Sequence, residues 1–276
     1  LSDYYVGRKI GEIWGYETDG YYTINDFNAD DAKHKTWTLK EGVVKINGYN
    51  PQPGDVKFKD LRTDGVINAG DNTVDNPGDR KVIGNDAARY QFGISLGASY
   101  KGWSLEVLLQ GVGKRDYWLG GPAMFPFGGA GAGDAVFQAL YANQTDYWRA
   151  KSYDPSSNDY MVPVNPDSKL FRIYDQGNNV GSNTRVSDKY LQNAAYMRIK
   201  NITLAYTLPK EWVRRAFIQD AKFYLSIENL ATFSSLPKGY DPEGTAPSSS
   251  ANALSNGISW GYPYYRTISL GASITF

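Results

Sequence analysis

The chain has 276 residues, with 29 basic and 29 acidic residues and no cysteine. The resulting zero net charge argues against a nucleic-acid partner, because no basic field would attract phosphates. Without cysteine, disulfides and thiolate metal sites are excluded. Mean hydropathy is −0.49, and no run of about 18 apolar residues predicts a transmembrane helix.

Six long strands are predicted, with connections that alternate between long and short. The connections 23–89, 114–190 and 234–263 are long, whereas 101–102 and 209–220 are short. Outer-membrane barrels have short periplasmic turns and long external loops, so this alternation is typical of them. In chain order, the strands are 6–22, 90–100, 103–113, 191–208, 221–233 and 264–276.

The strands at 90–100 and 264–276 alternate apolar side chains with Gly, Ser, Thr or Gln. Because successive strand residues point to opposite faces, each strand presents one apolar and one small polar wall. The strand at 103–113 continues this pattern, broken only at Leu108. Runs of about 9–11 residues are long enough to cross the hydrocarbon layer. A soluble β-sandwich also alternates, so a soluble β-rich protein remains the alternative.

The short connection between the fourth and fifth strands contains Pro209 to Phe217, which predicts a turn of amphipathic helix with a structural role. Six strands are too few to close a barrel, since the smallest have about eight. An open edge in lipid would leave backbone groups unpaired at several kcal/mol each. We therefore expect an all-β fold that is the carboxyl-terminal part of a larger transmembrane antiparallel barrel, or one that pairs with other chains.

The loop from Asp60 to Asp71 has the spacing of an EF-hand-type calcium loop. Acidic residues occupy its first, fifth and twelfth positions, and glycine its sixth. It departs from that pattern at Arg62, a cation in a ligand position, and at its last residue, which is Asp rather than the longer Glu. A bound Ca²⁺ and a solvated Asp-Gly turn both remain open. The candidate ligands are Asp60, Asp64, Val66 and Asp71.

Two groups of residues are candidates for substrate contacts. Loop aromatics near the strand ends offer ring faces to sugars or to a protein lid, unless they only pack the loops: Tyr117, Trp118, Phe125, Tyr147, Trp148, Tyr240, Trp260 and Tyr262. A second group is predicted to face the lumen, unless it only lines the barrel: Glu106, Gln110, Asn201, Tyr224 and Glu228. The residues favoured as substrate-binding are Glu106, Gln110, Tyr117, Trp118, Trp148, Tyr240 and Trp260.

No catalytic residue is predicted. His34 is the only histidine and lies in a charged loop. The glycine-rich segment 128–133 lacks the Lys-Ser/Thr of a phosphate-binding loop. Loop carboxylates are scattered, and no glycosidase pair can be assigned from their spacing. We expect a protein that is not an enzyme.

Several ordered motifs resemble the carboxyl-terminal region of SusC/RagA-type TonB-dependent transporters. The resemblance extends over essentially the whole chain and ends in the strand 264–276. The motifs are GEIWGYETDG at 11–20, PGDVKFKD at 53–60, TDGVI at 63–67, RKVIG at 80–84, YLQNAAYMRIKNITL at 190–204 and IENL at 227–230.

This resemblance implies a 22-stranded barrel in the outer membrane of a Gram-negative, Bacteroidetes-like bacterium. Residues 1–276 would be its carboxyl-terminal segment, with the plug domain, the amino-terminal strands and the TonB-contacting region outside this chain. The implied partners are a SusD-like surface lipoprotein, TonB, and an oligosaccharide or peptide that is imported. The alternative is a soluble, secreted, β-rich carbohydrate-binding module.

Overall fold

The computed structural model describes residues 7–28, 37–120, 124–125, 142–173, 180–238, 240–244 and 264–276. These residues are dominated by strands, with only short helices, and they form two compact units. Unit 1 consists of described residues within Leu1–Ala87 and Tyr117–Gln192. Unit 2 consists of described residues within Ala88–Asp116, Asn193–Ala246 and Trp260–Phe276. None of the described helices is both long and apolar enough to span a membrane.

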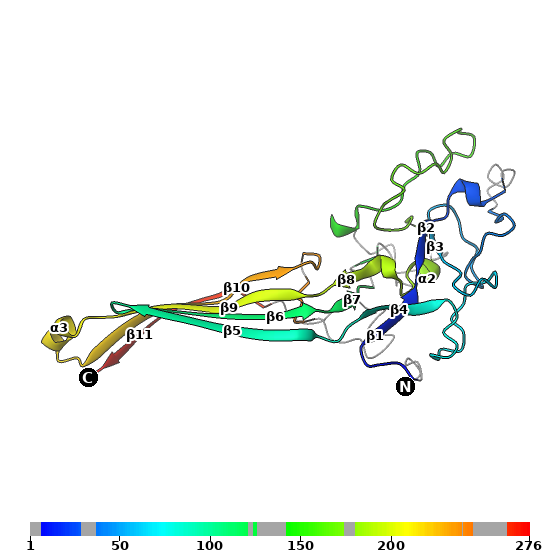
Figure 1. The fold of residues 1–276 in the computed structure, drawn as a ribbon. Coiled ribbons are helices and arrows are strands. Elements are labelled where there is room, and N and C mark those ends of the chain that lie inside the picture. Colours follow the sequence, from blue (N-terminus) through cyan, green and yellow to red (C-terminus); the bar gives the residue numbers. More distant parts are fainter. Residues whose placement is uncertain are drawn as a thin grey trace. The chain divides into compact units, whose positions relative to one another are not determined.

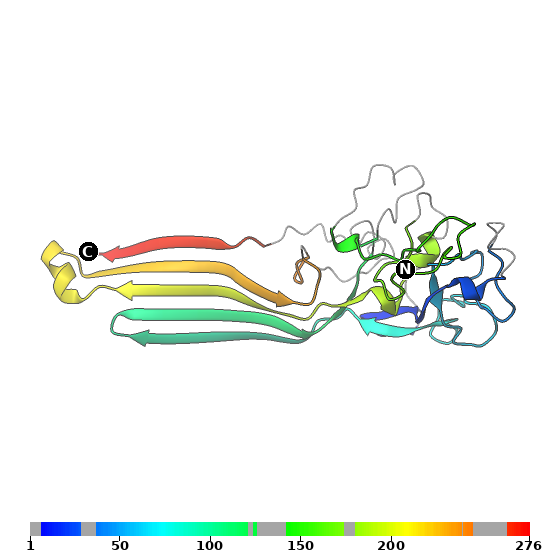
Figure 2. The ribbon, with the colours of Figure 1, turned by 90° about the horizontal axis from the view of Figure 1, so that it is seen from above.

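Unit 2 is a single antiparallel sheet of five long strands in the order β11-β10-β9-β6-β5 (Figures 1 and 2). The shortest has 9 residues and the longest 15, whereas strands in soluble sheets usually have about 5–6. Four of the five strands predicted in this region are confirmed with small shifts at their ends, whereas the strand predicted at 191–208 is interrupted and its long part begins only at Tyr196. Their bounds are β5 (Arg89–Tyr100), β6 (Trp103–Lys114), β9 (Tyr196–Thr207), β10 (Asp220–Ser234) and β11 (Thr267–Thr275).

Both short connections lie at the same end of this sheet. Lys101 and Gly102 have φ angles of 46° and 86°, and a tight two-residue hairpin favours such left-handed backbone. The amide of Thr207 donates to the Gly102 carbonyl at 2.8 Å, which brings the β9 end beside this turn. Between β9 and β10, Pro209 precedes the predicted helical turn, formed by α3 (Lys210–Val213) and η5 (Arg214–Ala216).

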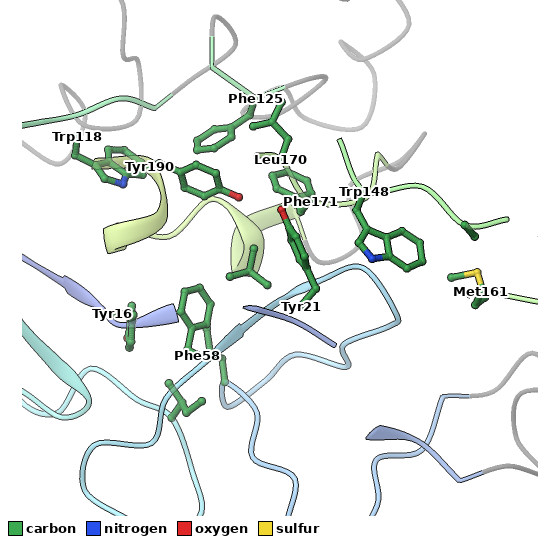
Figure 3. Close-up of a cluster of buried hydrophobic side chains, with 14 of the residues drawn as sticks. Tyr16, Tyr21, Phe58, Trp118, Phe125, Trp148, Met161, Leu170, Phe171 and Tyr190 are labelled. Carbon is green, nitrogen blue, oxygen red and sulfur yellow. The ribbon is translucent and has the colours of Figure 1, made fainter. Parts of the chain in front are cut away.

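Unit 1 contains short paired strands and loops around an aromatic core (Figure 3). Its strands are β1 (Glu12–Tyr16) paired with β4 (Arg80–Asn85), and β2 (Thr18–Tyr21) paired with β3 (Val56–Phe58). A further short pair is β7 (Asp116–Trp118) with β8 (Leu191–Asn193). The short helices are η1 (Ile24–Asp26), η3 (Ala142–Gln144), α2 (Val180–Asn183) and η4 (Asp188–Tyr190).

The predicted long strand at 6–22 is wrong. Its described residues form β1 and β2, two short strands that pair with different partners in unit 1. The extended run breaks at Glu17, between β1 and β2, and the left-handed φ angle of 78° at Gly20 makes the pairing of β2 with β3 irregular. Tyr16 and Tyr21 are both buried in the aromatic core of unit 1 and do not belong to the long-stranded sheet of unit 2. Val6 lies outside the described residues.

Candidate functional site

One face of the unit 2 sheet carries rows of apolar side chains that cross all five strands. Residues paired across neighbouring strands lie on the same face, so the register defines these rows. One row consists of Ala98, Leu105, Leu204, Leu225 and Leu270. The next consists of Leu96, Val107, Ile202, Ile227 and Ile268.

This apolar face is exposed in the described structure. Leu270 is 83% exposed, and Leu96, Leu105 and Ile268 are exposed as well. A sheet in water normally buries such a face against a second layer. Among the residues that the structure describes, no such layer buries these side chains.

Aromatic side chains lie at both ends of the apolar face. At the end with the short connections, Trp103 packs on Tyr206 with ring centroids 4.7 Å apart, and Phe223 is paired with Tyr206. Phe92 and Phe233 lie toward the opposite end. The strand from Trp103 to Gly111 covers ~26 Å at ~3.3 Å per residue. An apolar band about 25 Å tall between aromatic girdles is typical of transmembrane barrels.

The opposite face of the sheet is polar. One row across it consists of Gly97, Glu106, Thr203, Ser226 and Ser269. The side-chain amide nitrogen of Asn201 donates to Ser226 Oγ at 3.0 Å, and Thr203 Oγ1 donates to Asn201 Oδ1 at 2.9 Å. The residues predicted to share one face do so in this register, namely Glu106, Gln110, Asn201, Tyr224 and Glu228. Their contact with a substrate stays a prediction.

A β-bulge at Lys200 changes the alternation of β9. Leu108 and Leu109 are consecutive in β6, but their partners are Asn201 and Ile199, which leaves Lys200 as the extra residue. A bulge re-aims the side chains that follow it. It places Ile199 on the apolar face and Arg198 on the polar face. The sequence contained this signal, since the spacing of apolar residues slips by one between Ile199 and Ile202.

Arg198 is the centre of a charged cluster on the polar face. Its side chain is only 2% exposed. One guanidinium nitrogen donates to both carboxylate oxygens of Asp241 at 2.8 Å, and Nε donates to Thr232 Oγ1 at 2.8 Å. The other terminal nitrogen lies 3.2 Å from Glu243 Oε1, and Lys200 Nζ donates to Glu243 Oε2 at 2.9 Å. Two cations and two carboxylates therefore balance each other.

The charged cluster holds the segment 240–244 against the sheet. The ring of Tyr264 lies 5.0 Å from the Arg198 guanidinium and 4.6 Å from Lys200 Nζ, at cation–π distances. Arg115 also donates to the Pro242 carbonyl at 3.3 Å. Burial would raise the pKa of the Asp241 carboxyl, but the Glu243 backbone amide and Arg198 hold that pKa below its usual value. Asp241 is therefore ionised at neutral pH.

Four of the predicted ligand-binding aromatics instead belong to the buried interior. Trp118 and Trp148 are core residues of unit 1, and Tyr117 is also buried. Phe125 packs edge-on against Tyr190 in the same core. Their rings are covered by neighbouring side chains, so sugar stacking on them is not supported. The alternation of loop and strand could not distinguish a covered ring from an open one.

The other predicted aromatics have different surroundings. Tyr240 is partly buried beside the charged cluster, where its amide donates to the Pro237 carbonyl at 3.2 Å. Tyr147 is partly buried against the core of unit 1. Trp260 and Tyr262 lie outside the described residues. Of the favoured substrate-binding residues, Glu106 and Gln110 share the polar face of the sheet with Arg198.

The predicted calcium loop is organised by Asp79, which the spacing argument missed. This buried carboxylate accepts from the amides of Leu61, Arg62 and Asn68 at 2.8–3.2 Å. Asp71 instead accepts from the Asn76 side chain at 2.7 Å. Within the described ranges, no three acidic, histidine or cysteine residues are grouped as a metal site requires. A cation bound by Asp60, Asp64, Val66 and Asp71 stays a prediction.

Comparison with known proteins identifies relatives over nearly the whole chain. No protein-family model matches it. The chain is 26% identical over 275 residues to TonB-dependent receptor P3 of Formosa agariphila, covering 98% of this chain. It is 25% identical to TonB-dependent receptors P26 and P39 of the same organism, covering 87% and 98% of this chain. It spans only 22–25% of the length of these relatives.

Solved structures of a peptide importer are also similar. The RagAB peptide importer in its open-open state has a TM-score of 0.49 and 19% identity, covering 96% of this chain and 22% of that one. The RagAB peptide transporter has a TM-score of 0.49 and 17% identity, covering 100% of this chain and 25% of that one. Similarity at this level does not by itself establish a common fold. The sequence comparisons confirm the resemblance to TonB-dependent receptors, to which this chain is similar along nearly its whole length.

Proposed function

We propose that this chain forms the carboxyl-terminal part of the wall of a TonB-dependent outer-membrane transporter that imports oligosaccharides or peptides. The observation that carries the proposal is the exposed apolar face shared by all five long strands. Contact of this apolar face with lipid hydrocarbon would cost no free energy, whereas its exposure to water is unfavourable. The polar face would then line the lumen.

The edges of the sheet support a larger barrel. In the described sheet, β5 and β11 each have a strand partner on one side only. Free strand edges are excluded from the hydrocarbon region, so further strands must continue the sheet on both sides. The proposed whole is a 22-stranded barrel with a plug, to which this chain contributes one segment.

The long connections would lie outside the cell. The charged cluster fixes part of one of them, the connection 234–263. Arg198 and Lys200 hold the segment 240–244 against the lumenal face. That segment would narrow the external mouth through which a captured oligosaccharide or peptide passes. Glu106 and Gln110, on the same face, remain the proposed polar contacts for it.

The proposed partners are a SusD-like surface lipoprotein that delivers the substrate and TonB, which supplies energy through the region outside this chain. The relatives of the chain are named as receptors, which supports transport rather than catalysis. Loss of uptake and of growth on oligosaccharides or peptides after deletion, together with recovery of a surface lipoprotein in detergent extracts, would test these roles.

Two neighbouring residues on β11 give a direct test of the membrane-spanning sheet. Ser269 and Leu270 are both exposed in this chain but lie on opposite faces. Single cysteines can be placed at each position, because the chain has none of its own. In outer membranes, we expect Ser269→Cys to react with a small water-soluble maleimide through the lumen and Leu270→Cys to be protected.

Protection of Leu270→Cys should disappear when the membrane is dissolved and the protein unfolded. Equal labelling of both cysteines in intact membranes would contradict the barrel. If the intact protein were also monodisperse in buffer without detergent, the soluble carbohydrate-binding module would replace the transporter.

A further inference from the structure

The turn between β9 and β10 exposes two large aromatic side chains beside two arginines. Trp212 is 64% exposed and Phe217 is 93% exposed. Arg214 and Arg215 lie between them in sequence, are exposed, and form no salt bridge with any described residue. We call residues 210–217 the basic turn. Exposed aromatics beside exposed arginines form an amphipathic surface without a partner in the described structure.

The basic turn is held in place by its own contacts, so it presents these side chains in a fixed arrangement. Val213 is buried, while its neighbours point outward. The amide of Phe217 donates to the Arg214 carbonyl at 3.1 Å, and that of Ile218 to the Val213 carbonyl at 3.3 Å. Phe217 has a φ angle of 57°, a left-handed conformation that is costly for a bulky residue. Phe217 ends the helical turn in this conformation, and its side chain is left exposed.

The basic turn lies next to the aromatic row at one end of the apolar face. Tyr206 and Phe223, which flank the turn on β9 and β10, are cross-strand partners in that aromatic row. Lys101 lies in the neighbouring hairpin turn at the same end and Lys210 begins the basic turn, so both add positive charge. Glu211 and Asp220 are the acidic residues of this connection, which leaves a net positive end.

We propose that the basic turn is an anchor that seats on the phospholipid leaflet facing the periplasm, with Trp212 and Phe217 in the interface and Arg214 and Arg215 on anionic headgroups. This inference rests on the proposed function, which places the end with short connections at that leaflet. Aromatic rings favour the headgroup level of a bilayer, and guanidinium groups bind phosphate with two parallel hydrogen bonds. The arginines and the two aromatic rings of the basic turn thus both fit a phospholipid surface, the arginines at its phosphates and the rings at its headgroup level.

Fluorescence quenching by lipids tests the anchor in the whole transporter reconstituted into vesicles. A fluorophore on Ala216→Cys reports on the basic turn and leaves its aromatic and arginine residues intact. We expect brominated phosphatidylglycerol to quench it more strongly than brominated phosphatidylcholine. The R214Q/R215Q variant should lower this lipid preference roughly tenfold or more, since each charge at an anionic surface contributes roughly fivefold.

A matched control removes two exposed lysines that are distant in sequence from the basic turn. K9Q/K40Q makes the same change in charge within unit 1 and should leave the lipid preference unchanged. Equal quenching by the two lipids that is unaffected by R214Q/R215Q would overturn the headgroup contact.

A second probe separates failure of the anchor from failure of the transporter. A fluorophore on Leu270→Cys reports on the apolar face of the sheet. If this probe is quenched by lipid while the Ala216→Cys probe is quenched only by aqueous iodide, the anchor is wrong and the transporter stands. If both probes are in water, the proposed function itself fails.

Discussion

The two units of this chain treat their large apolar side chains in opposite ways. Unit 1 buries them, with Phe58, Trp148 and Tyr190 at most 1% exposed. Unit 2 presents Leu96, Leu270 and their neighbours on an open face. Composition alone does not distinguish the two, since both are rich in aromatic and aliphatic residues. The difference shows that unit 1 covers its apolar side chains with its own residues, whereas unit 2 leaves an apolar face open, for which the proposed function supplies lipid.

The largest expected effect is on the core of unit 1. Trp148 packs closely on Gly54, where an added Cβ would lie 2.6 Å from the indole ring. Trp148→Ala should lower the free energy of unfolding of unit 1 by about 3–5 kcal/mol. Hydrogen exchange of the Val56 amide, which is bonded to Asn183, would measure it. Val164→Ala, at a half-exposed position, should change stability by no more than about 0.5 kcal/mol.

The next effect concerns the charged cluster on the polar face of unit 2. Arg198→Gln leaves Asp241 and Glu243 without their main counter-charge. The free energy of unfolding should fall by an amount toward the lower end of about 3–5 kcal/mol, because both carboxylates are partly hydrated. We expect the segment 240–244 to become sensitive to protease while the strands stay protected. If the segment remains protected, the cluster does not hold it in place.

A charge on the apolar face should cost less but should distinguish the two faces. Ile202 and Thr203 are neighbours in the middle of β9 and lie on opposite faces. Ile202→Arg should destabilise the protein in lipid by about 2–4 kcal/mol, whereas Thr203→Arg should be tolerated in a wet lumen. Urea unfolding in vesicles would compare them. If the two arginine variants destabilised the protein equally, the apolar face would be in water like the polar one, because a face open to water accepts arginine. The contrast between the two units would then be lost.

The smallest effect is an acid dependence at the surface of unit 1. Glu17 accepts from Lys59 at 2.6 Å and also pairs with Lys81, and these contacts lower its pKa to about 2. Because the folded pKa is below the unfolded value of about 4.3, this contribution is complete above that value and is lost as pH falls toward 2. NMR titration of the Glu17 carboxyl would measure the shift, which high salt should reduce. A titration midpoint near 4.3 would contradict it.

Much of unit 2 was predictable from the sequence. Four of its five strands were placed within a few residues, and the common face of Glu106, Asn201 and Glu228 followed from alternation. The helical turn after Pro209 was also expected and is present. The bulge at Lys200 was overlooked, although the slip in apolar spacing indicated it, and with it the position of Arg198.

Unit 1 was much less predictable. Its strands have only 3–6 residues, too short for a period to be read reliably. For Trp118 and Trp148 the sequence left ligand contact and loop packing both open, and the structure shows that residues distant in the chain bury them. Asp79 was missed because it accepts hydrogen bonds from amides far from it in the sequence, such as that of Leu61, 18 positions earlier.

The sequence by itself determined the long alternating strands, their two unlike faces and the contrast between short and long connections, since these depend on a local period of two residues. Only the tertiary structure decided which aromatic rings are buried and which carboxylates meet Arg198. Those features depend on contacts between residues far apart in the chain, and local pattern carries no information about which distant segments meet.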